Sequence, residues 1–334
     1  MSRPPGPRGV PIIGARKSPT MRFSRTTRGT CLACDDRSEP AVDERPLRIC
    51  ALDGYELGAV LYSARAGAAP RRAVVLHGGA GIPARRYRHF ARFLARSGVP
   101  VLTYDYRGIG LSRPSTLRGF RSVIEDWAEY DCSAAIGWLR ERFPRAELVG
   151  IAHSVSALLF GGAHNAGEQA RLILVGAHTG YYGDYRPRYR LPMAVLWHGL
   201  MPVLTRLIGY FPARRLSLGE DIPAGVALQW AARRSSDLRP VGASPGDERT
   251  RRLLDRCAAL ERPALVIRIS DDAFATAAGM RRLLAYYPRL SPQYGFFTPA
   301  DAGVRKIGHF GFFGRKAGLA LWPQLVARLP PPES

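Results

Sequence analysis

A serine flanked by small residues is the first candidate for chemistry in this sequence. Ser154 follows a short apolar run, residues 148–151, and precedes a run that is compatible with a helix. A strand, a sharp turn and a helix in so few residues hold the turn residue in a strained conformation, with its side chain at the strand tip. Such a turn accepts only small side chains two positions away. Ala152 and Ser156 meet that demand around Ser154. With Ser156 at the tip, Leu158 would clash, so Ser154 is the candidate nucleophile.

A serine hydroxyl becomes reactive when an imidazole takes its proton and a carboxylate holds that imidazole in one tautomer. Among the seven histidines, His309 lies in a glycine-flanked loop after the last predicted strand. Glycines there let the backbone approach the turn of the nucleophile. His178, which ends a strand that enters the predicted cap, is a second candidate base. Structural roles suit the remaining histidines: His77, His89, His153, His164 and His198.

The carboxylate is expected at the carboxyl end of a strand, where sheet enzymes place their functional loops. Asp271 and Asp272 follow the predicted strand 263–269. One of them can accept a hydrogen bond from the imidazole while the other caps the following helix. The chain order is then serine, aspartate, histidine, as expected when a strand–serine–helix turn carries a triad.

The elements that position these residues alternate between strand and helix. Predicted strands lie at 47–52, 56–63, 72–76, 99–104, 148–151, 172–175, 263–269 and 294–298. Predicted helices lie at 84–97, 123–143, from 157 onward, 275–286 and 317–329. Apolar strands without alternation indicate a mostly parallel sheet covered by helices on both faces. Right-handed crossovers make this a doubly wound α/β fold.

Three parts of the chain differ in composition. Residues 1–45 are rich in proline and arginine, lack periodicity and predict a disordered basic tail. Residues 46–178 and 248–334 carry the strand–helix alternation and predict one core domain. Residues 179–247 interrupt it with predicted helices near 192–208 and 224–234, and we expect an inserted helical cap over the carboxyl edge of the sheet.

Composition excludes several classes of function. The formal charge is +22, but the arginines are scattered without a basic stripe, so we expect no nucleic-acid partner. Five irregularly spaced cysteines suit a reducing compartment, and we expect a cytoplasmic protein. The apolar stretch 193–211 is broken by His198, Pro202 and Arg206, so we expect no integral membrane span.

Five motifs together resemble those of the α/β-hydrolase superfamily. In chain order they are HGGAG, DYRGIGLS, AHSVS, SDDAFAT and IGHFG. Further stretches, including GYFP and EDIP, are similar to a bacterial branch described only as predicted α/β hydrolases or serine-hydrolase-like lipases. The resemblance covers about residues 47–330.

The resemblance implies roles for individual residues. Ser154 would be the nucleophile, His309 the base and an aspartate at 271 or 272 the acid. Asp272 is favoured because Thr276 fills the position, four residues on, that family members usually give to a proline-like residue. The backbone N–H groups of Gly79 and Val155 would form the oxyanion hole. No metal and no organic cofactor is implied.

This sequence also departs from the superfamily. Ala152 and Ser156 stand where glycine is usual, and the hydroxyl of Ser156 is an addition beside the nucleophile. A serine rather than an aspartate at position 154 argues against dehalogenase and epoxide-hydrolase chemistry.

The first hypothesis is a serine hydrolase that cleaves carboxylic esters through an acyl-enzyme, with a medium-sized, apolar small-molecule ester as the substrate. Aromatic residues of the cap would line its pocket: Tyr181, Trp197, Phe211 and Trp230. The same triad also serves thioesterases, amidases and acyltransferases. A different class of function is the alternative: the hydrolase fold could have lost catalytic turnover and serve as a binding module. The sequence does not indicate an oligomeric state.

Overall fold

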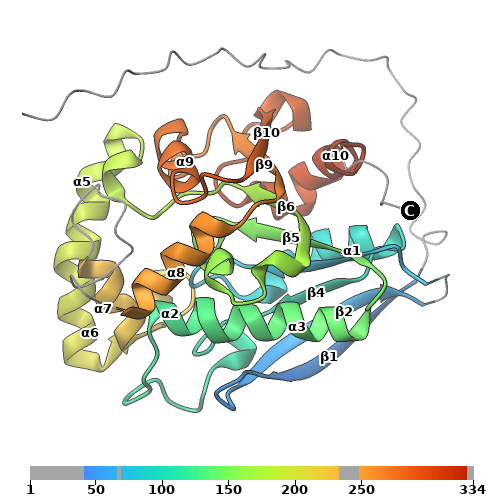
Figure 1. Ribbon diagram of the computed structural model, residues 1–334. Helices are drawn as coiled ribbons and strands as arrows, with labels where there is room; N and C mark the ends of the chain where they lie inside the picture. Colours follow the sequence, from blue (N-terminus) through green and yellow to red (C-terminus); the bar gives the residue numbers. More distant parts are fainter. Residues whose placement is uncertain (1–40, 66–68, 233–247, 329–334) are drawn as a thin grey trace, which may run out of the picture. The chain divides into compact units, whose positions relative to one another are not determined.

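The central element is one sheet in a computed structural model that describes residues 41–65, 69–232 and 248–328 (Figure 1). The described residues form eight strands in the order β1–β2–β4–β3–β5–β6–β9–β10. Their bounds are β1 Val42–Cys50, β2 Glu56–Ala64, β3 Arg72–His77, β4 Val101–Tyr104, β5 Glu147–His153, β6 Gln169–Val175, β9 Pro263–Ile269 and β10 Ser291–Phe297. β2 pairs antiparallel with β1 and with β4, and the other pairs are parallel. The predicted mostly parallel sheet is therefore confirmed.

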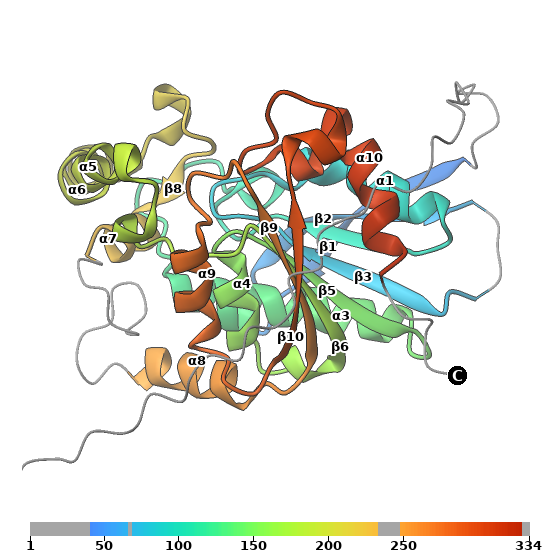
Figure 2. The same cartoon turned by 90° about the horizontal axis from the view of Figure 1, so that it is seen from above.

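Helices cover both faces of this sheet. Outside the cap they are α1 Arg88–Arg96, α2 Ile124–Asp126, α3 Ser133–Arg142, α4 Ser156–Leu159, α8 Glu248–Ala259, α9 Ala277–Leu284 and α10 Arg315–Val326. A π-helical segment, Trp127–Cys132, joins α2 to α3. Figure 2 shows α1 and α10 on one face of the sheet and α3 on the other. This is the doubly wound arrangement that the alternation predicts.

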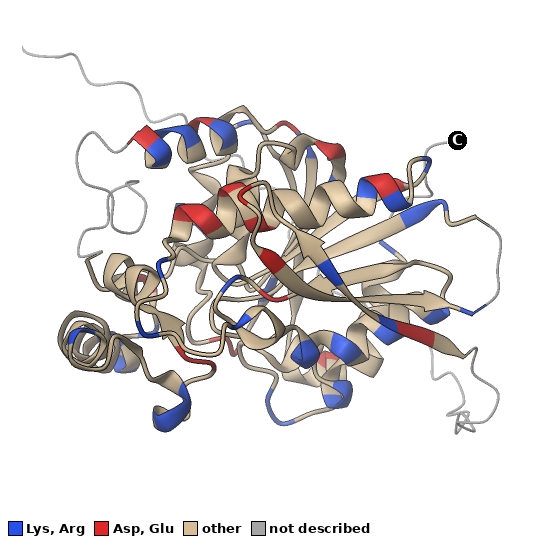
Figure 3. Cartoon of the chain, turned by 90° about the horizontal axis from the view of Figure 1, so that it is seen from below, with Lys and Arg blue, Asp and Glu red and all other residues tan. Residues whose placement is uncertain are grey.

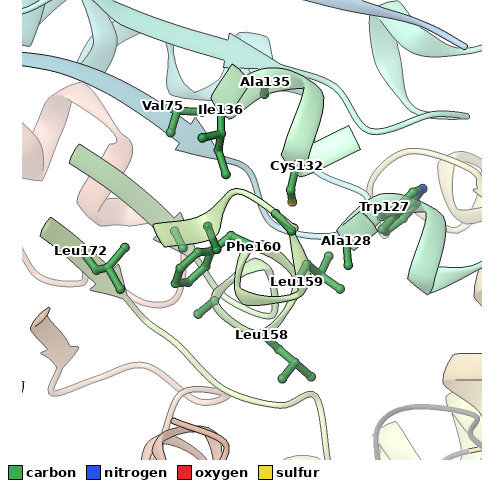
Figure 4. Close-up of a cluster of buried hydrophobic side chains, with 14 of the residues drawn as sticks. Val75, Trp127, Ala128, Cys132, Ala135, Ile136, Leu158, Leu159, Phe160 and Leu172 are labelled. Atoms are coloured by element: carbon green, nitrogen blue, oxygen red, sulfur yellow. The ribbon is translucent and has the colours of Figure 1, made fainter. Parts of the chain in front are cut away.

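The core lies between the sheet and the helices that follow β4 and β5. Ile136 of α3, Val75 of β3 and Leu172 of β6 are almost fully buried and belong to one apolar cluster. Phe160, directly after α4, is buried in the same cluster (Figure 4). This packing anchors both sides of the turn at Ser154, because β5 enters it and α4 leaves it.

The cap follows β6 and lies beyond the carboxyl ends of β5 and β6 (Figures 1 and 2). Its elements are α5 Pro187–Val195, α6 Met201–Ile208, α7 Ala224–Ala232 and the short antiparallel strands β7 Tyr210–Phe211 and β8 Ile222–Pro223. A π-helical turn, Leu196–Leu200, makes α5 and α6 one continuous helix, Pro187–Ile208. We call this 22-residue element the cap helix. Residues 233–247 of the predicted cap lie outside the described residues.

The predicted boundary of the N-terminal tail needs correction. β1 begins at Val42, so the predicted tail extends four residues too far. Val42 pairs with Ala64 at the far end of β2, and this pairing holds a strand whose own residues are mostly exposed. By length and composition alone the cap helix could span a membrane, and 11% of its most apolar window is buried. One such helix is weak evidence, so the expectation of no integral span stays a prediction. Residues 1–40, with Cys31 and Cys34, are outside the described residues.

Candidate active site

Ser154 sits at the carboxyl end of β5 in a left-handed backbone conformation, with φ of +63°. A non-glycine residue there is strained, and the packed strand and helix on either side maintain the strain. The hydroxyl of Ser156 does not enter the site. Its Oγ lies 2.8 Å from the carbonyl of His77 and accepts from the N–H of His153 at 3.0 Å, so it holds the turn closed.

The structure brings Ser154, His309 and Asp272 together from three loops. Nε2 of His309 is 2.9 Å from Oγ of Ser154, and its Nδ1 is 2.7 Å from Oδ2 of Asp272. A carboxylate only accepts, so Nδ1 of His309 carries the proton and donates it to Asp272. Nε2 is then free to accept the proton of the Ser154 hydroxyl. This is the arrangement in which an imidazole acts as a general base.

Asp272 and Asp271 have different hydrogen-bonding partners and different roles. Burial would raise the pKa of Asp272, but His309 and the backbone N–H groups of Phe274 and Ala275 hold that pKa at about 2. Asp272 is therefore ionised at ordinary pH. Both carboxylate oxygens of Asp271 instead accept backbone N–H groups of the loop before His309, at 2.9 Å each. Asp271 fixes the loop, and Asp272 meets the imidazole.

Gly176, directly after β6, allows this close approach. Its φ is +55°, and a Cβ placed on it would lie 3.2 Å from Oδ2 of Asp272 and 3.5 Å from Nδ1 of His309. Any side chain at position 176 would therefore be strained and would press on the aspartate–histidine pair.

A second imidazole also contacts the serine. Nε2 of His178 lies 3.1 Å from Oγ of Ser154. Nδ1 of His178 accepts the backbone N–H of Gly180 at 2.9 Å, so in the neutral ring the proton is on Nε2. His178 therefore donates to the serine oxygen, whereas His309 accepts from it. The sequence suggested His178 as an alternative base, but its tautomer makes it a donor.

A third histidine supports the base through its backbone. Nε2 of His153 donates to the carbonyl of His309 at 3.0 Å, which leaves Nδ1 to accept from the hydroxyl of Tyr87 at 2.9 Å. Burial, together with the neighbouring His309, lowers the pKa of His153 to about 3. His153 is thus neutral at ordinary pH and has the structural role expected of it.

The glycine-rich loop differs from expectation at Gly79. Its N–H donates to the hydroxyl of Tyr87 at 2.7 Å, so it is already occupied and does not serve an oxyanion hole in this structure. The next residue, Ala80, lines the same cavity as Ser154 and Val155. The backbone N–H groups of Ala80 and Val155 donate to no other residue within the described part of the chain.

A cavity of about 320 Å³ opens over the serine, between the sheet and the cap. Trp197, Phe211 and Trp230 line it, as the sequence suggested. Tyr181 does not: its ring packs on Tyr182 and on the guanidinium of Arg282 instead. The other lining residues include Ile82, Arg86, Met193, Leu196, Met201, Leu218, Ile222, Phe274 and Phe310.

The described residues contain no cluster of three or more His, Cys, Asp or Glu side chains placed to hold a metal ion. The carboxylate nearest to Ser154, that of Asp272, is hydrogen-bonded to His309. Ser154, His309 and Asp272 can themselves perform acid–base and nucleophilic chemistry.

Sequence reasoning missed Tyr87 and Gly176 and undervalued His178. Gly176 and His178 follow an apolar strand directly, and that position was the available signal, because the carboxyl ends of parallel strands meet at one edge of a sheet. Tyr87 gave no such signal, since it lies in a helical turn and reaches the site only through its hydroxyl.

Comparison with known proteins agrees with the fold. The profile of the family described as "Serine aminopeptidase, S33" matches residues 68–236. An esterase of Pyrococcus furiosus is 15% identical over 85% of this chain and 89% of its own, with a TM-score of 0.53. A bacterial brefeldin A esterase is 17% identical over 89% of this chain and 78% of its own, with a TM-score of 0.53.

A soluble variant of monoglyceride lipase from Saccharomyces cerevisiae is similar to the same extent. It is 15% identical over 88% of this chain and 97% of its own, with a TM-score of 0.53. At these identities the likeness of the three structures concerns the fold.

Proposed function

The chain belongs to the α/β-hydrolase superfamily, and we propose that it hydrolyses carboxylic esters through an acyl-enzyme on Ser154. One observation carries the proposal: Oγ of Ser154, in a strained turn, lies 2.9 Å from Nε2 of an imidazole whose Nδ1 is held by a buried carboxylate. That geometry makes a serine hydroxyl nucleophilic near neutral pH.

Acylation begins when the Ser154 hydroxyl gives its proton to Nε2 of His309 and Oγ bonds to the ester carbonyl carbon. Asp272 stabilises the imidazolium that results. The carbonyl oxygen becomes an oxyanion, which accepts from the N–H groups of Val155 and Ala80. Each such donor is typically worth about 3–4 kcal/mol in the transition state. His309 then protonates the alkoxy oxygen, the alcohol leaves, and an acyl ester of Ser154 remains.

Deacylation repeats these steps with water as the nucleophile. His309 takes a proton from the water, and the hydroxide adds to the acyl carbon. The new tetrahedral intermediate collapses when His309 returns a proton to Oγ of Ser154, and a carboxylic acid is released.

His178 is a positioning residue in this scheme. Its Nε2–H occupies one lone pair of Oγ, so the serine proton can point only toward His309. The serine thereby has one donor and one acceptor on two separate rings, and its side-chain rotamer is fixed before substrate binds.

The residues that line the cavity favour an apolar ester over a peptide with a free amino terminus. The family profile is named for an aminopeptidase, and an enzyme of that kind needs an anion for the α-ammonium group of its substrate. No Asp or Glu is among the residues that line this cavity, all of which lie in the described part of the chain. Arg86 is the charged side chain on the lining that is not part of the histidine network, and it would repel an ammonium group.

Fluorophosphonate labelling with mapping of the modified residue tests the nucleophile. The wild-type protein should be labelled at Ser154, and Ser154→Ala should not be labelled. Ser97→Ala, which alters an exposed serine at the end of α1, is the matched control and should be labelled as the wild type is. Equal labelling of Ser154→Ala, with both variants folded, would overturn the assignment.

A series of p-nitrophenyl acyl esters of increasing chain length tests the substrate class. We expect turnover of short and medium acyl chains, with kcat/KM rising until the cavity is filled. Faster cleavage of an amino-acid p-nitroanilide than of any ester in the series would contradict the choice of an ester over an amide.

A further inference from the structure

The cap helix is apolar on the side that faces away from the cavity. Its exposed large apolar residues are Leu191, Val195, Leu200, Val203 and Leu207, with exposed fractions from 41% to 75%. They recur every three to five residues, and the interval of five falls on the π-helical turn, where one turn takes more residues. They therefore lie along one side of a helix about 33 Å long, which we call the outward face.

The opposite side of the same helix closes the active-site cavity. Met193, Leu196, Trp197 and Met201 all line the space above Ser154. Their apolar character is explained by the cavity and by packing against α7. Nothing in the described residues covers the outward face, and soluble proteins expose contiguous apolar surface of this kind mainly where they bind something.

Charge around the outward face indicates what it binds. From Tyr185 to Gly219 the sequence has no Asp or Glu, but it has six arginines. Arg188 and Arg206 are exposed near the two ends of the cap helix. Figure 3 shows blue but no red on this helix, which is seen end-on. An apolar helix face bordered by cations and free of carboxylates is typical of helices that lie in the interface of an anionic membrane.

We propose that the outward face of the cap helix docks on the surface of a membrane that contains anionic lipid. The helix lies in the interface rather than across the bilayer, because spanning would expose its cavity-lining side to lipid and open the site. The outward apolar residues enter the acyl-chain boundary, and Arg188 and Arg206 meet lipid phosphates. The cavity then lies directly behind the docked helix, close to the layer in which an apolar ester dissolves.

Vesicle co-sedimentation of the Ser154→Ala protein tests docking without turnover. The vesicles are phosphatidylcholine alone, or phosphatidylcholine with roughly 30% phosphatidylglycerol, a content sufficient to attract basic segments. We expect binding to the anionic vesicles that weakens as salt is raised, and much weaker binding to the neutral ones. Absence of binding to anionic vesicles at low salt would overturn the proposal.

Paired variants locate the contact. Leu191→Gln with Leu207→Gln should lower the partition coefficient roughly 10- to 100-fold, because two apolar side chains no longer enter the lipid. Leu52→Gln with Leu319→Gln is the matched control: these leucines are 74% and 54% exposed but lie on the β1–β2 turn and on α10. The control pair should bind as the parent protein does. An equal loss in both pairs would refute the assignment to the cap helix.

Light scattering with size-exclusion chromatography distinguishes lipid from a second copy of the chain. If the protein is a dimer that Leu191→Gln with Leu207→Gln converts to a monomer while vesicle binding stays unchanged, the outward face is a subunit interface and the proposal is wrong. Docking does not depend on esterase activity. A failed ester assay would leave the sedimentation result intact, and turnover of a soluble ester without vesicle binding would refute docking alone.

Discussion

Replacement of His178 by alanine removes one of the two imidazoles that contact Oγ of Ser154. In the structure, Nε2–H of His178 donates to that oxygen at 3.1 Å, while the serine proton points to His309 at 2.9 Å. Without His178 the hydroxyl can turn among its rotamers, and only some of them present the proton to His309. The variant should therefore be slower in the acylation step.

The size of the fall in kcat/KM shows whether His178 positions the serine or stabilises charge in the transition state. A hydrogen bond between neutral groups contributes about 0.5–1.5 kcal/mol, so loss of a positioning bond should lower kcat/KM by roughly 2- to 12-fold. A donor to charge that develops in the transition state is worth about 3–4 kcal/mol, and its loss costs roughly 100- to 1,000-fold. Oγ accepts from His178 in the resting enzyme and gives up electron density during attack. We therefore expect the smaller loss, mainly in kcat, with KM nearly unchanged.

Stopped-flow measurement of the p-nitrophenol burst gives the acylation rate separately from deacylation. Two further variants supply the comparison. The amide N–H of His178→Gln reaches about as far as Nε2 and should restore most of the rate, whereas the shorter His178→Asn mimics only Nδ1 and should not. Thermal unfolding of all three variants shows whether any of them has lost the fold.

Two outcomes would refute the reasoning about His178. An unchanged acylation rate in a folded His178→Ala protein would mean that the 3.1 Å contact has no kinetic effect. A loss beyond about 100-fold, with no rescue by glutamine, would mean that His178 carries charge or a proton in the transition state rather than orienting the serine.

Three other perturbations have definite expected results. Asp272→Asn should lower kcat about 10³- to 10⁴-fold, because the imidazole loses its orienting carboxylate. Asp271→Asn should lower kcat less than about tenfold. Measurement of ester turnover for both variants, normalised to folded protein, tests this difference. Gly176→Ala should lower kcat at least about tenfold, since the new Cβ meets Oδ2 of Asp272 at 3.2 Å, and a change in melting temperature without loss of turnover would contradict this. Burial lowers the pKa of His77 to about 4, and burial with His309 lowers that of His153 to about 3. Below pH 6.5 the unfolded chain therefore takes up protons that the folded protein does not. The contribution of each of these histidines to the free energy of unfolding should be complete above about pH 7 and fall by roughly 2 kcal/mol by pH 5. The raised pKa values of Asp105, about 6, and Asp131, about 7, act in the opposite direction over this range, so urea titrations at both pH values compare the wild type with His77→Gln and His153→Gln.

Most of the sheet could be predicted because its central strands are short, continuous apolar runs. β5, β6 and β9 are buried on both faces, and burial on both faces is what an apolar run without alternation indicates. The start of β1 could not be predicted in this way. Val42 to Pro46 are mostly exposed, and they form a strand only because β2 extends to Ala64 and pairs with them. Pairing, rather than composition, decides where such an edge strand begins.

The three side chains at the centre of the site could be proposed from their order and from the strand ends that they follow. Their hydrogen-bonding partners could not be. Gly79 was expected to donate to an oxyanion, but the hydroxyl of Tyr87 takes its N–H because that hydroxyl is itself oriented by His153. His178 is the second candidate base from the sequence, but the N–H of Gly180 fixes its proton on Nε2 and makes it a donor. Both differences have one physical origin. A residue type states how many protons a side chain can offer or accept, whereas the donor or acceptor that it meets is set by tertiary contacts between distant loops. This site is built from the imidazoles of His153, His178 and His309, a tyrosine and backbone N–H groups, and the tertiary partners of each ring decide which histidine takes the serine proton.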